Sequence, residues 1–167
     1  MTPGNPDSTT EITVRAATPA DAEVALKLFQ EDLKALSSTE RLDDGDLRNL
    51  SQAYLEDADS GFWVAELQGV VVGMIGVRAG ADHSAEICRL RVQLAHRRHG
   101  IGTRLLEQAV NHCRERGLLK ISLDVLADRR PAIDLFEKTG FRLNRERKMD
   151  DRVQMTFYID LYQERGG

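Results

Sequence analysis

The sequence predicts a mixed α/β (α+β) fold in which helices cover both faces of a twisted sheet of about seven strands. Runs of alternating apolar and polar residues indicate strands, and stretches with apolar residues at helical spacing indicate helices. These segments follow one another as β-α-α-β-β-β-α-β-α-β-β, so antiparallel hairpins lie beside one β-α-β crossover. Helices on both sides of such a sheet bury the apolar faces of all its elements.

The first half of the chain contains two predicted helices among strands. Proline at the first position of a helix, followed by acidic residues, is typical of a helix start. Gln68-Gly69 between two β-rich runs predicts a tight hairpin. In chain order the predicted elements are a strand at 12–16, a helix beginning at Thr18-Pro19, a shorter helix at 46–57, and strands at 62–67, 70–77 and 85–92.

The second half predicts the crossover and a final hairpin. Glycines at 117 and 140 follow amphipathic stretches, as expected for residues that end helices. The predicted elements are a helix at 100–116, a strand at 120–126, a helix at 131–139, a strand beginning at 141 and a last strand at 153–162. Residues 1–10, rich in Pro, Gly, Asn, Ser and Thr, predict a disordered tail before a single domain at 11–163.

Composition excludes several classes of protein. The longest apolar run, residues 70–77, is far shorter than the roughly 20 residues that cross a bilayer. The start of the chain lacks the pattern of a secretory signal, so we expect a cytoplasmic protein without a membrane partner. A net charge of −4 argues against a general nucleic-acid binder. We expect Cys88 and Cys113 to be reduced, and His96 and His99 lack a third residue at metal-ligand spacing.

The most informative segment runs from a predicted strand end at Val92 to a predicted helix start at Gly100. Amide groups in the first turn of a helix point outward and attract anions, and glycines let a phosphate approach the backbone. Arg97 and Arg98 add positive charge beside that turn. A dinucleotide fingerprint would need glycine where Leu105 stands, and the Gly-Lys-Ser/Thr of a P-loop is absent from the sequence.

The run Arg97-Arg98-His99-Gly100-Ile101-Gly102 resembles the acetyl-CoA motif of the GNAT superfamily of N-acetyltransferases, Gln/Arg-x-x-Gly-x-Gly/Ala. Ala132-Ile133-Asp134-Leu135-Phe136-Glu137-Lys138-Thr139-Gly140-Phe141 resembles that family's second signature, and the order of elements also agrees. The resemblance implies a GNAT-type sheet and acetyl-CoA as the acyl donor, with no metal. It implies that the backbone of Leu90, Arg91 and Val92 binds the pantetheine arm. The pyrophosphate would be wrapped by Arg97, Arg98, His99, Gly100, Ile101, Gly102 and Thr103.

The resemblance also suggests how catalysis would proceed. Glu86 falls where the family often has a catalytic glutamate, and by alternation it shares a face with Cys88 and Leu90. It is either the base, directly or through water, or a structural residue that points to solvent or pairs with an arginine. The backbone N–H of Val92 would stabilise the oxyanion. Phe136 stands where the family usually has a tyrosine that protonates the thiolate, so we expect it to pack against the cofactor arm.

Other assignments from the sequence stay open. Tyr158 is a weak substitute for the missing tyrosine, and Arg129 and Arg130 either reach the 3′-phosphate of CoA or are solvated.

Family resemblance places the acceptor between residues 29–54 and 145–152. A small-molecule amine is the first choice of acceptor, and a protein N-terminus or lysine is the second. A CoA-binding regulatory module without turnover is the alternative, and a homodimer is compatible with the family. Acidic residues in the first region either favour a cationic acceptor or are solvated: Glu31, Asp32, Glu40, Asp43, Asp44 and Asp46.

Overall fold

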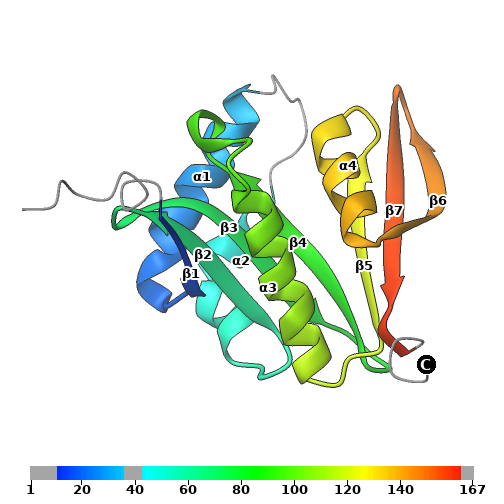
Figure 1. The fold of residues 1–167 in the computed structure, drawn as a ribbon, viewed down its shortest axis with the longest axis horizontal. Coiled ribbons are helices and arrows are strands. Elements are labelled where there is room, and N and C mark those ends of the chain that lie inside the picture. Colours follow the sequence, from blue (N-terminus) through cyan, green and yellow to red (C-terminus); the bar gives the residue numbers. More distant parts are fainter. Residues whose placement is uncertain (1–10, 36–42, 163–167) are drawn as a thin grey trace, which may run out of the picture.

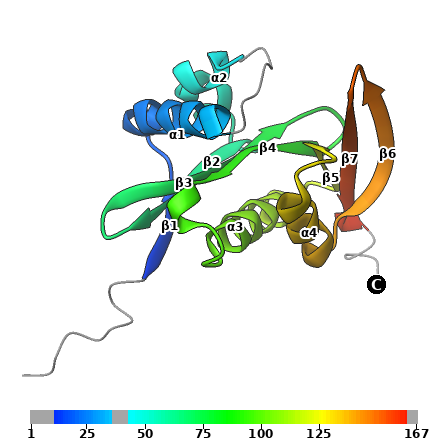
Figure 2. The same cartoon turned by 90° about the horizontal axis from the view of Figure 1, so that it is seen from above.

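A seven-stranded sheet separates two layers of helices in the computed structural model, which describes residues 11–35 and 43–162 (Figures 1 and 2). The predicted tail, residues 1–10, lies outside the described residues. Strand order is β1-β2-β3-β4-β5-β7-β6, with only the β4–β5 pair parallel. The strands are β1 (Ile12–Ala16), β2 (Gly61–Leu67), β3 (Val70–Ala79), β4 (Ser84–Val92), β5 (Lys120–Leu126), β6 (Arg142–Met149) and β7 (Arg152–Asp160).

Helices cover the two faces of the sheet unequally. The helices α1 (Ala22–Ala35) and α2 (Gly45–Arg48) lie on one face over β2, β3 and β4, whereas α3 (Ile101–Glu115) and α4 (Arg130–Thr139) lie on the other (Figure 2). Each face has its own apolar core, one centred on α3 and the other on α1. The predicted mixed sheet with helices on both faces is therefore confirmed.

The predicted helix at 46–57 is wrong as a continuous α-helix. The segment forms the short α2 and then a wider π-helical turn at Ser51–Leu55. Asn49 interrupts the regular geometry with φ −121° and ψ 52°, and its side-chain amide donates to the carbonyl of Gly45. The wider turn buries Tyr54, which is 1% exposed, against the sheet. Apolar spacing alone did not distinguish this arrangement from an ordinary helix.

A β-bulge in β4 reverses the alternation of its side chains. Arg91 pairs with Met74 while Cys88 pairs with Gly76, so β4 has one more residue than β3 over this stretch. Arg89 has a φ of 58°, the left-handed conformation that non-glycine residues seldom adopt. Leu90 consequently packs into the α3 core, whereas Cys88 packs into the α1 core. The prediction that Leu90 shares a face with Glu86 and Cys88 is wrong for this reason.

Candidate active site

The strands β4 and β5 separate after their first residues, and we call the unpaired region between them the cleft. The two parallel strands pair only at their beginnings, where Glu86 is the last residue of β4 in register with β5, opposite Ser122. Both strands continue, to Val92 and Leu126, but they diverge toward the N-terminal end of α3 (Figure 1). Backbone groups of β4 that would otherwise bond to β5 therefore line the cleft, where an extended ligand can pair with them.

The pairing of β4 with β3 determines which backbone groups face this cleft. The Gln93 N–H donates to the Val72 carbonyl at 2.8 Å, which makes this a hydrogen-bonded pair. In an antiparallel pair of strands, hydrogen-bonded pairs alternate with pairs whose N–H and C=O groups point away from the partner strand. Val92 and Gly73 form the next pair, so the N–H and C=O of Val92 point away from β3. The Val92 N–H and C=O therefore point toward the cleft. Arg97 Nε donates to that carbonyl at 3.1 Å, so the basic loop closes over the end of β4.

The turn at the N-terminus of α3 lies beside the end of β4 and is suited to bind an anion. Gly100 precedes the helix with a φ of 78°, and its carbonyl accepts the N–H of Arg104 at 3.1 Å. The amides of Ile101, Gly102 and Thr103 come before that first bond, so helix geometry leaves them without acceptors inside α3. Three exposed side chains supply positive charge or hydrogen-bond donors beside this turn: Arg97, Arg98 and His99.

The two glycines of the turn have different tasks. A Cβ on Gly100 would meet nothing within 4 Å, and its left-handed backbone favours glycine there. A Cβ on Gly102 would lie 3.2 Å from Cδ2 of Leu135, which is tighter than an ordinary contact. Gly102 therefore lets α3 and α4 approach closely, and Gly100 keeps space open in front of the helix. The sequence alone predicts that both glycines leave space for a phosphate, and the structure supports this role for Gly100 only.

Phe136 lies in the core beside the cleft. It is 5% exposed, and its ring centroid lies 6.1 Å from that of Phe141 and 6.4 Å from that of Phe157. These ring contacts make it first a packing residue of α4. Its predicted contact with a ligand arm stays a prediction.

Glu86 lies at the apex of the cleft in a row of residues that crosses the sheet. Arg78 of β3 is its neighbour on one side, and Ser122 and then Tyr158 follow on the other. Although Glu86 is exposed, neighbouring atoms displace enough water to raise its pKa, and the negative charge of Asp124 raises it further while Arg78 opposes the shift. A carboxylate with a raised pKa is a stronger base than an ordinary one and therefore better suited to accept a proton.

Glu86 and Val92 are too far apart to act on the same atom. Six residues of extended strand span about 20 Å, and the extra residue of the bulge shortens this only slightly. A glutamate side chain covers only a fraction of that distance. If both residues take part in one reaction, a proton must move through water from the Val92 end of the cleft to Glu86.

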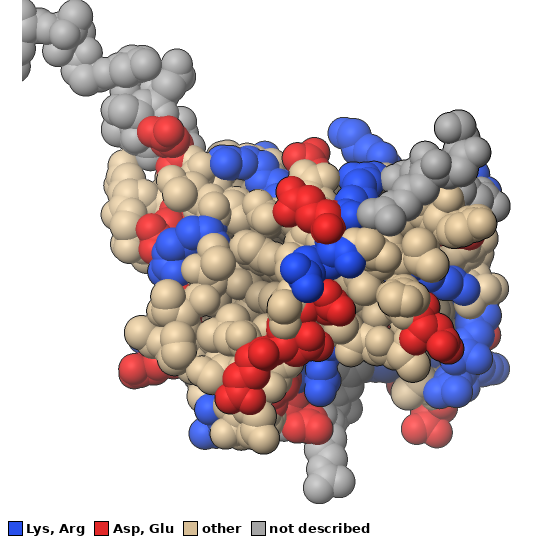
Figure 3. Space-filling model, turned by 90° about the horizontal axis from the view of Figure 1, so that it is seen from below, with Lys and Arg blue, Asp and Glu red and all other residues tan. Residues whose placement is uncertain are grey.

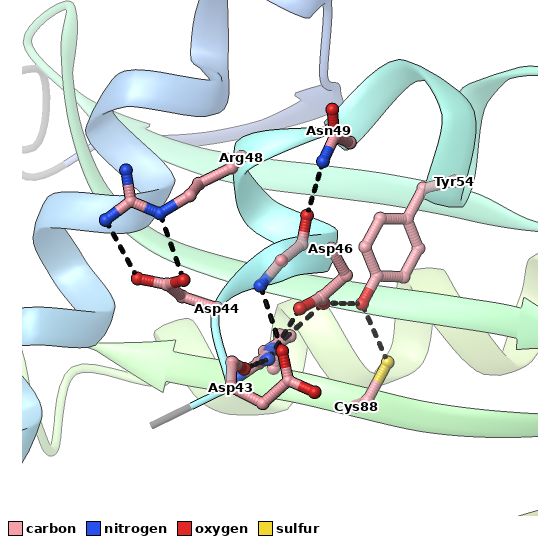
Figure 4. A network of polar contacts seen from close by, with 9 residues as sticks. Asp43, Asp44, Asp46, Arg48, Asn49, Tyr54 and Cys88 are labelled. Atoms are coloured by element: carbon pink, nitrogen blue, oxygen red, sulfur yellow. Dashed lines mark hydrogen bonds and ion pairs between the residues drawn. The ribbon is translucent and has the colours of Figure 1, made fainter. Parts of the chain in front are cut away.

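An ion-pair network that the sequence did not predict anchors the bulge (Figure 4). Arg89 donates to Asp46 Oδ1 at 2.6 Å and Oδ2 at 3.0 Å, and also to the backbone carbonyl of Asp43. Its guanidinium lies 4.4 Å from the ring centroid of Phe29 in α1. These contacts connect the left-handed residue of β4 to both helices of the α1 layer.

Tyr54 extends this network to Cys88. Its hydroxyl donates to Asp46 and lies 3.3 Å from Cys88 Sγ (Figure 4). Burial would raise the pKa of Asp46, but hydrogen bonds from Arg89 and Tyr54 outweigh burial and lower it. Burial, the neighbouring Cys88 and Asp46 raise the pKa of Tyr54. Burial raises the pKa of Cys88 to about 11, so at neutral pH this residue is a thiol and not a thiolate nucleophile.

The predicted acceptor region contains fewer unpaired acids than its sequence suggests. Asp44 pairs with Arg48 at 3.0 Å and Asp46 with Arg89 at 2.6 Å, while Glu40 and the side chain of Asp32 lie outside the described residues. A polar cavity of about 440 Å³ lies between this region and the sheet. Its lining is Asp43, Gly45, Asp46, Asn49, Gln52, Ala53, Arg78 and Arg89. The cavity carries both signs of charge, so these acids do not form a cation site on their own.

The remaining sequence-based candidates lie at the edges of the site. Tyr158 is two strands away from Glu86, with β5 between them, and the ammonium of Lys120 lies 5.2 Å from the Tyr158 ring centroid. Arg129 precedes α4 and Arg130 is its first residue, and α4 lies on the same face of the sheet as α3 (Figure 2). Within residues 11–35 and 43–162 no group of His, Cys, Asp or Glu is arranged to hold a metal, and no helix is long and apolar enough to cross a membrane.

Positive and negative side chains are mixed on one face of the molecule. Figure 3 shows one face of the molecule on which acidic and basic side chains are interspersed. A nucleic-acid-binding face usually carries a continuous basic footprint. On the face shown, no such footprint dominates.

Comparison with known proteins points to one family. The sequence profile of the Acetyltransferase (GNAT) family matches residues 24–141. The probable N-acetyltransferase camello of Xenopus tropicalis is 31% identical over 102 residues, which cover 60% of this chain and 47% of that protein. N-acetyltransferase 8 of Rattus norvegicus is 31% identical over 121 residues, which cover 70% of this chain and 53% of that protein. The chain thus spans about half the length of these curated relatives.

Solved structures share the fold. A GNAT-family acetyltransferase from Staphylococcus aureus superposes with a TM-score of 0.79 at 22% identity, covering 90% of this chain and 99% of that one. The putative acetyltransferase yncA of Salmonella typhimurium, solved with its cofactor acetyl-CoA, gives a TM-score of 0.75 at 19% identity, covering 90% and 94%. At these identities the similarity establishes the architecture.

Proposed function

The chain belongs to the Acetyltransferase (GNAT) family, and from this premise we propose that it transfers an acetyl group from acetyl-CoA to a primary amine. One observation carries the proposal. The unpaired end of β4 in the cleft lies beside the turn before α3, because Arg97, just before that turn, donates to the carbonyl of Val92. Acetyl-CoA has an extended pantetheine arm and a pyrophosphate. The cleft would bind the arm, and the turn before α3 would bind the pyrophosphate.

The residues present fit this cosubstrate. The outward-pointing backbone of Val92, with Leu90 and Arg91 before it, would bind the pantetheine arm as an added strand. The amides at the start of α3 and the side chain of Arg97 would bind the pyrophosphate. The open space in front of Gly100 leaves room for phosphate oxygens. An acetyl-CoA complex of a protein with the same fold supports this placement.

Two features support direct transfer from the thioester to the amine. When bound, acetyl-CoA would supply an activated acetyl group, and the Val92 N–H would stabilise negative charge on its carbonyl oxygen. Cys88 is held as a thiol next to Tyr54, which disfavours an acetyl-cysteine intermediate. Glu86 would accept the proton of the amine through water. Because Phe136 lacks a hydroxyl, water would protonate the departing thiolate.

Both kinds of acceptor named from the sequence are compatible with the cleft. The first choice of acceptor is a small-molecule amine, and the second is a protein N-terminus or lysine. A CoA-binding module without turnover would share the cleft and the turn. Production of an acetylated amine distinguishes an enzyme from such a module.

Incubation of the full chain with acetyl-CoA and a panel of amines, small molecules and peptides, tests the proposal. We expect release of CoA to depend on the amine, and mass spectrometry to show one added acetyl group on the product. Release of CoA with no acetylated amine, or no turnover with any amine although acetyl-CoA binds, would overturn the proposal.

Cys88→Ala separates direct transfer from a covalent route. We expect the variant to retain most of the turnover, because the reaction does not pass through the thiol. The measurement is the rate of CoA release by the variant and by the wild-type chain under the same conditions. Acetylated Cys88 trapped in the wild-type chain, together with loss of turnover in the variant, would contradict direct attack.

A further inference from the structure

Part of one face of the sheet is not covered by any helix within the described part of the chain. On the α1 side, the helices lie over β2, β3 and β4, and the surface of β5, β7 and β6 is left open (Figure 2). Leu123 of β5 and Phe157 of β7 point to the α3 core on the opposite side. Side chains at alternate positions therefore face the open side, and four neighbouring ones are polar: Ser122, Asp124, Thr156 and Tyr158. This open face adjoins the cleft that begins at Glu86.

A second bulge aligns three arginines along the outer edge of this face. In β6, Leu143 pairs with Phe157 and Arg145 with Thr156, so Asn144 is an extra residue. If β6 alternated without a bulge, Arg145, two residues after Leu143, would lie on the α4 side with Leu143. With it, Arg142, Arg145 and Arg147 stand opposite Tyr158, Thr156 and Gln154, respectively, all on the open face. We call these three residues the arginine ladder.

The ladder has no partner within the part of the chain that the structure describes, in contrast to several other arginines. Its side chains are exposed, and among the described residues they make no ion pair or side-chain hydrogen bond. Arg15 pairs with Asp21 at 2.8 Å, and Arg89 pairs with Asp46. The chain carries a net charge of −4, so an unpaired row of three cations is a local feature. Guanidinium groups in such a row bind carboxylates well.

The length and spacing of the ladder indicate what it binds. Alternate residues of a strand are about 7 Å apart, so three rungs extend over about 14 Å. An extended peptide presents alternate side chains at the same interval. A small amine would contact one rung or two, whereas an acidic peptide segment matches all three.

Protection of an exposed edge is a weaker explanation for these arginines. Charged residues on an edge strand discourage unwanted pairing, and β6 is such an edge. Charge on either side of the strand would serve that purpose, and Lys148 and Glu146 already supply it on the other side. Edge protection does not require a bulge that brings three cations onto the face next to the cleft.

We propose that the acceptor is a polypeptide whose amine enters the cleft between β4 and β5 while acidic residues near that amine lie on the arginine ladder. The inference rests on the proposed acetyltransferase function and specifies its substrate class. It selects the polypeptide acceptor over the small-molecule amine. Attraction between exposed charges is screened by salt, so the preference for acidic sequences decreases as ionic strength rises.

Peptides that share an amino terminus and differ only at alternate downstream positions test the proposal. The three series carry Glu, Ser or Lys at those positions, and the measurement is kcat/KM for each at low and at high salt. We expect the Glu series to be acetylated about tenfold faster than the Ser series at low salt, and the Lys series to be slowest. Equal rates for the three series, or turnover restricted to small amines, would overturn the proposal.

Adjacent residues of β6 provide matched variants. Arg147→Glu reverses a charge on the open face, and Lys148→Glu makes the same charge change on the other face. We expect Arg147→Glu to lower kcat/KM for the Glu series about fivefold and to raise it for the Lys series, whereas Lys148→Glu leaves the preference unchanged. The same effect from both variants would overturn the ladder as the binding surface.

Failure of this inference can be told apart from failure of the proposed function. Titration with acetyl-CoA and turnover of a small amine report on the function alone. A chain that binds acetyl-CoA and acetylates amines without preferring acidic peptides contradicts the acceptor class only. A chain that does neither contradicts the function.

Discussion

Asp46→Ala is expected to lower the free energy of unfolding by about 3 kcal/mol, because removal of one partner leaves the other charge of a buried pair uncompensated. Arg89 would lose both of its bonds to the carboxylate, and the hydroxyl of Tyr54 would lose its acceptor. The side chains of Asp46 and Arg89 are only 10% and 17% exposed, so water replaces these bonds poorly. Urea denaturation followed by circular dichroism measures the loss.

Asp44→Ala is the matched control. Asp44, just before the same short helix, pairs with Arg48 on the surface, and such exposed pairs contribute little to stability. The effect of Asp46→Ala should also depend on pH. Because the pKa of Asp46 is lowered below its ordinary 3.8 in the folded chain, the carboxylate stabilises the fold above that value. The difference between wild type and variant should vanish as pH falls through the lowered pKa. Equal losses from the two substitutions would contradict the anchoring role of Asp46.

Glu86→Gln is expected to reduce kcat/KM by about a hundredfold, which is typical for loss of a general base. The substitution preserves size and removes only the ability to accept a proton. Since burial and Asp124 raise the pKa of Glu86, the wild-type rate should rise as pH increases through that raised value. The glutamine variant should lack this rise. The measurement is a pH profile of kcat/KM with an amine of low pKa, whose own titration does not overlap the rise.

Asp124→Asn provides the control for this assignment. Removal of its negative charge should lower the pKa of Glu86 and move the rise in rate to lower pH without abolishing turnover. The carboxylate of Asp124 accepts a hydrogen bond from Thr156 at 2.6 Å, and the amide oxygen of asparagine can keep that bond. Full activity in Glu86→Gln would show that Glu86 is structural.

The architecture could be predicted from the sequence because local signals agree with it. Alternating apolar residues correctly indicated the strands of the seven-stranded sheet, and the glycines at 100, 117 and 140 mark helix ends in the structure. The turn before α3 was recognised because glycine and arginine beside a helix start have a direct physical meaning. Such signals come from residues close together in the chain.

The rest of the site depends on contacts between distant segments. Asp46 and Arg89 are 43 positions apart in the sequence, and nothing in either residue type indicates that they form an ion pair. The bulge in β4 is centred on an arginine with positive φ, where glycine would have been the usual sign. The alignment of the arginine ladder likewise depends on a bulge at Asn144, which alternation cannot reveal. The separation of β4 from β5 depends on how these two strands, which are distant in the sequence, pair within the sheet, and no local pattern indicates it.

Calorimetric titration of the full chain with acetyl-CoA, repeated with Arg97→Glu, tests the central claim most directly. The claim is that the cleft and the turn before α3 bind this cosubstrate. We expect saturable binding to the wild-type chain and a loss of affinity of about a hundredfold in Arg97→Glu, because a charge-assisted bond becomes a repulsion. Arg114→Glu, which makes the same charge change near the other end of α3, should bind like the wild type. No binding by the wild-type chain, or equal affinity of Arg97→Glu, would contradict the account.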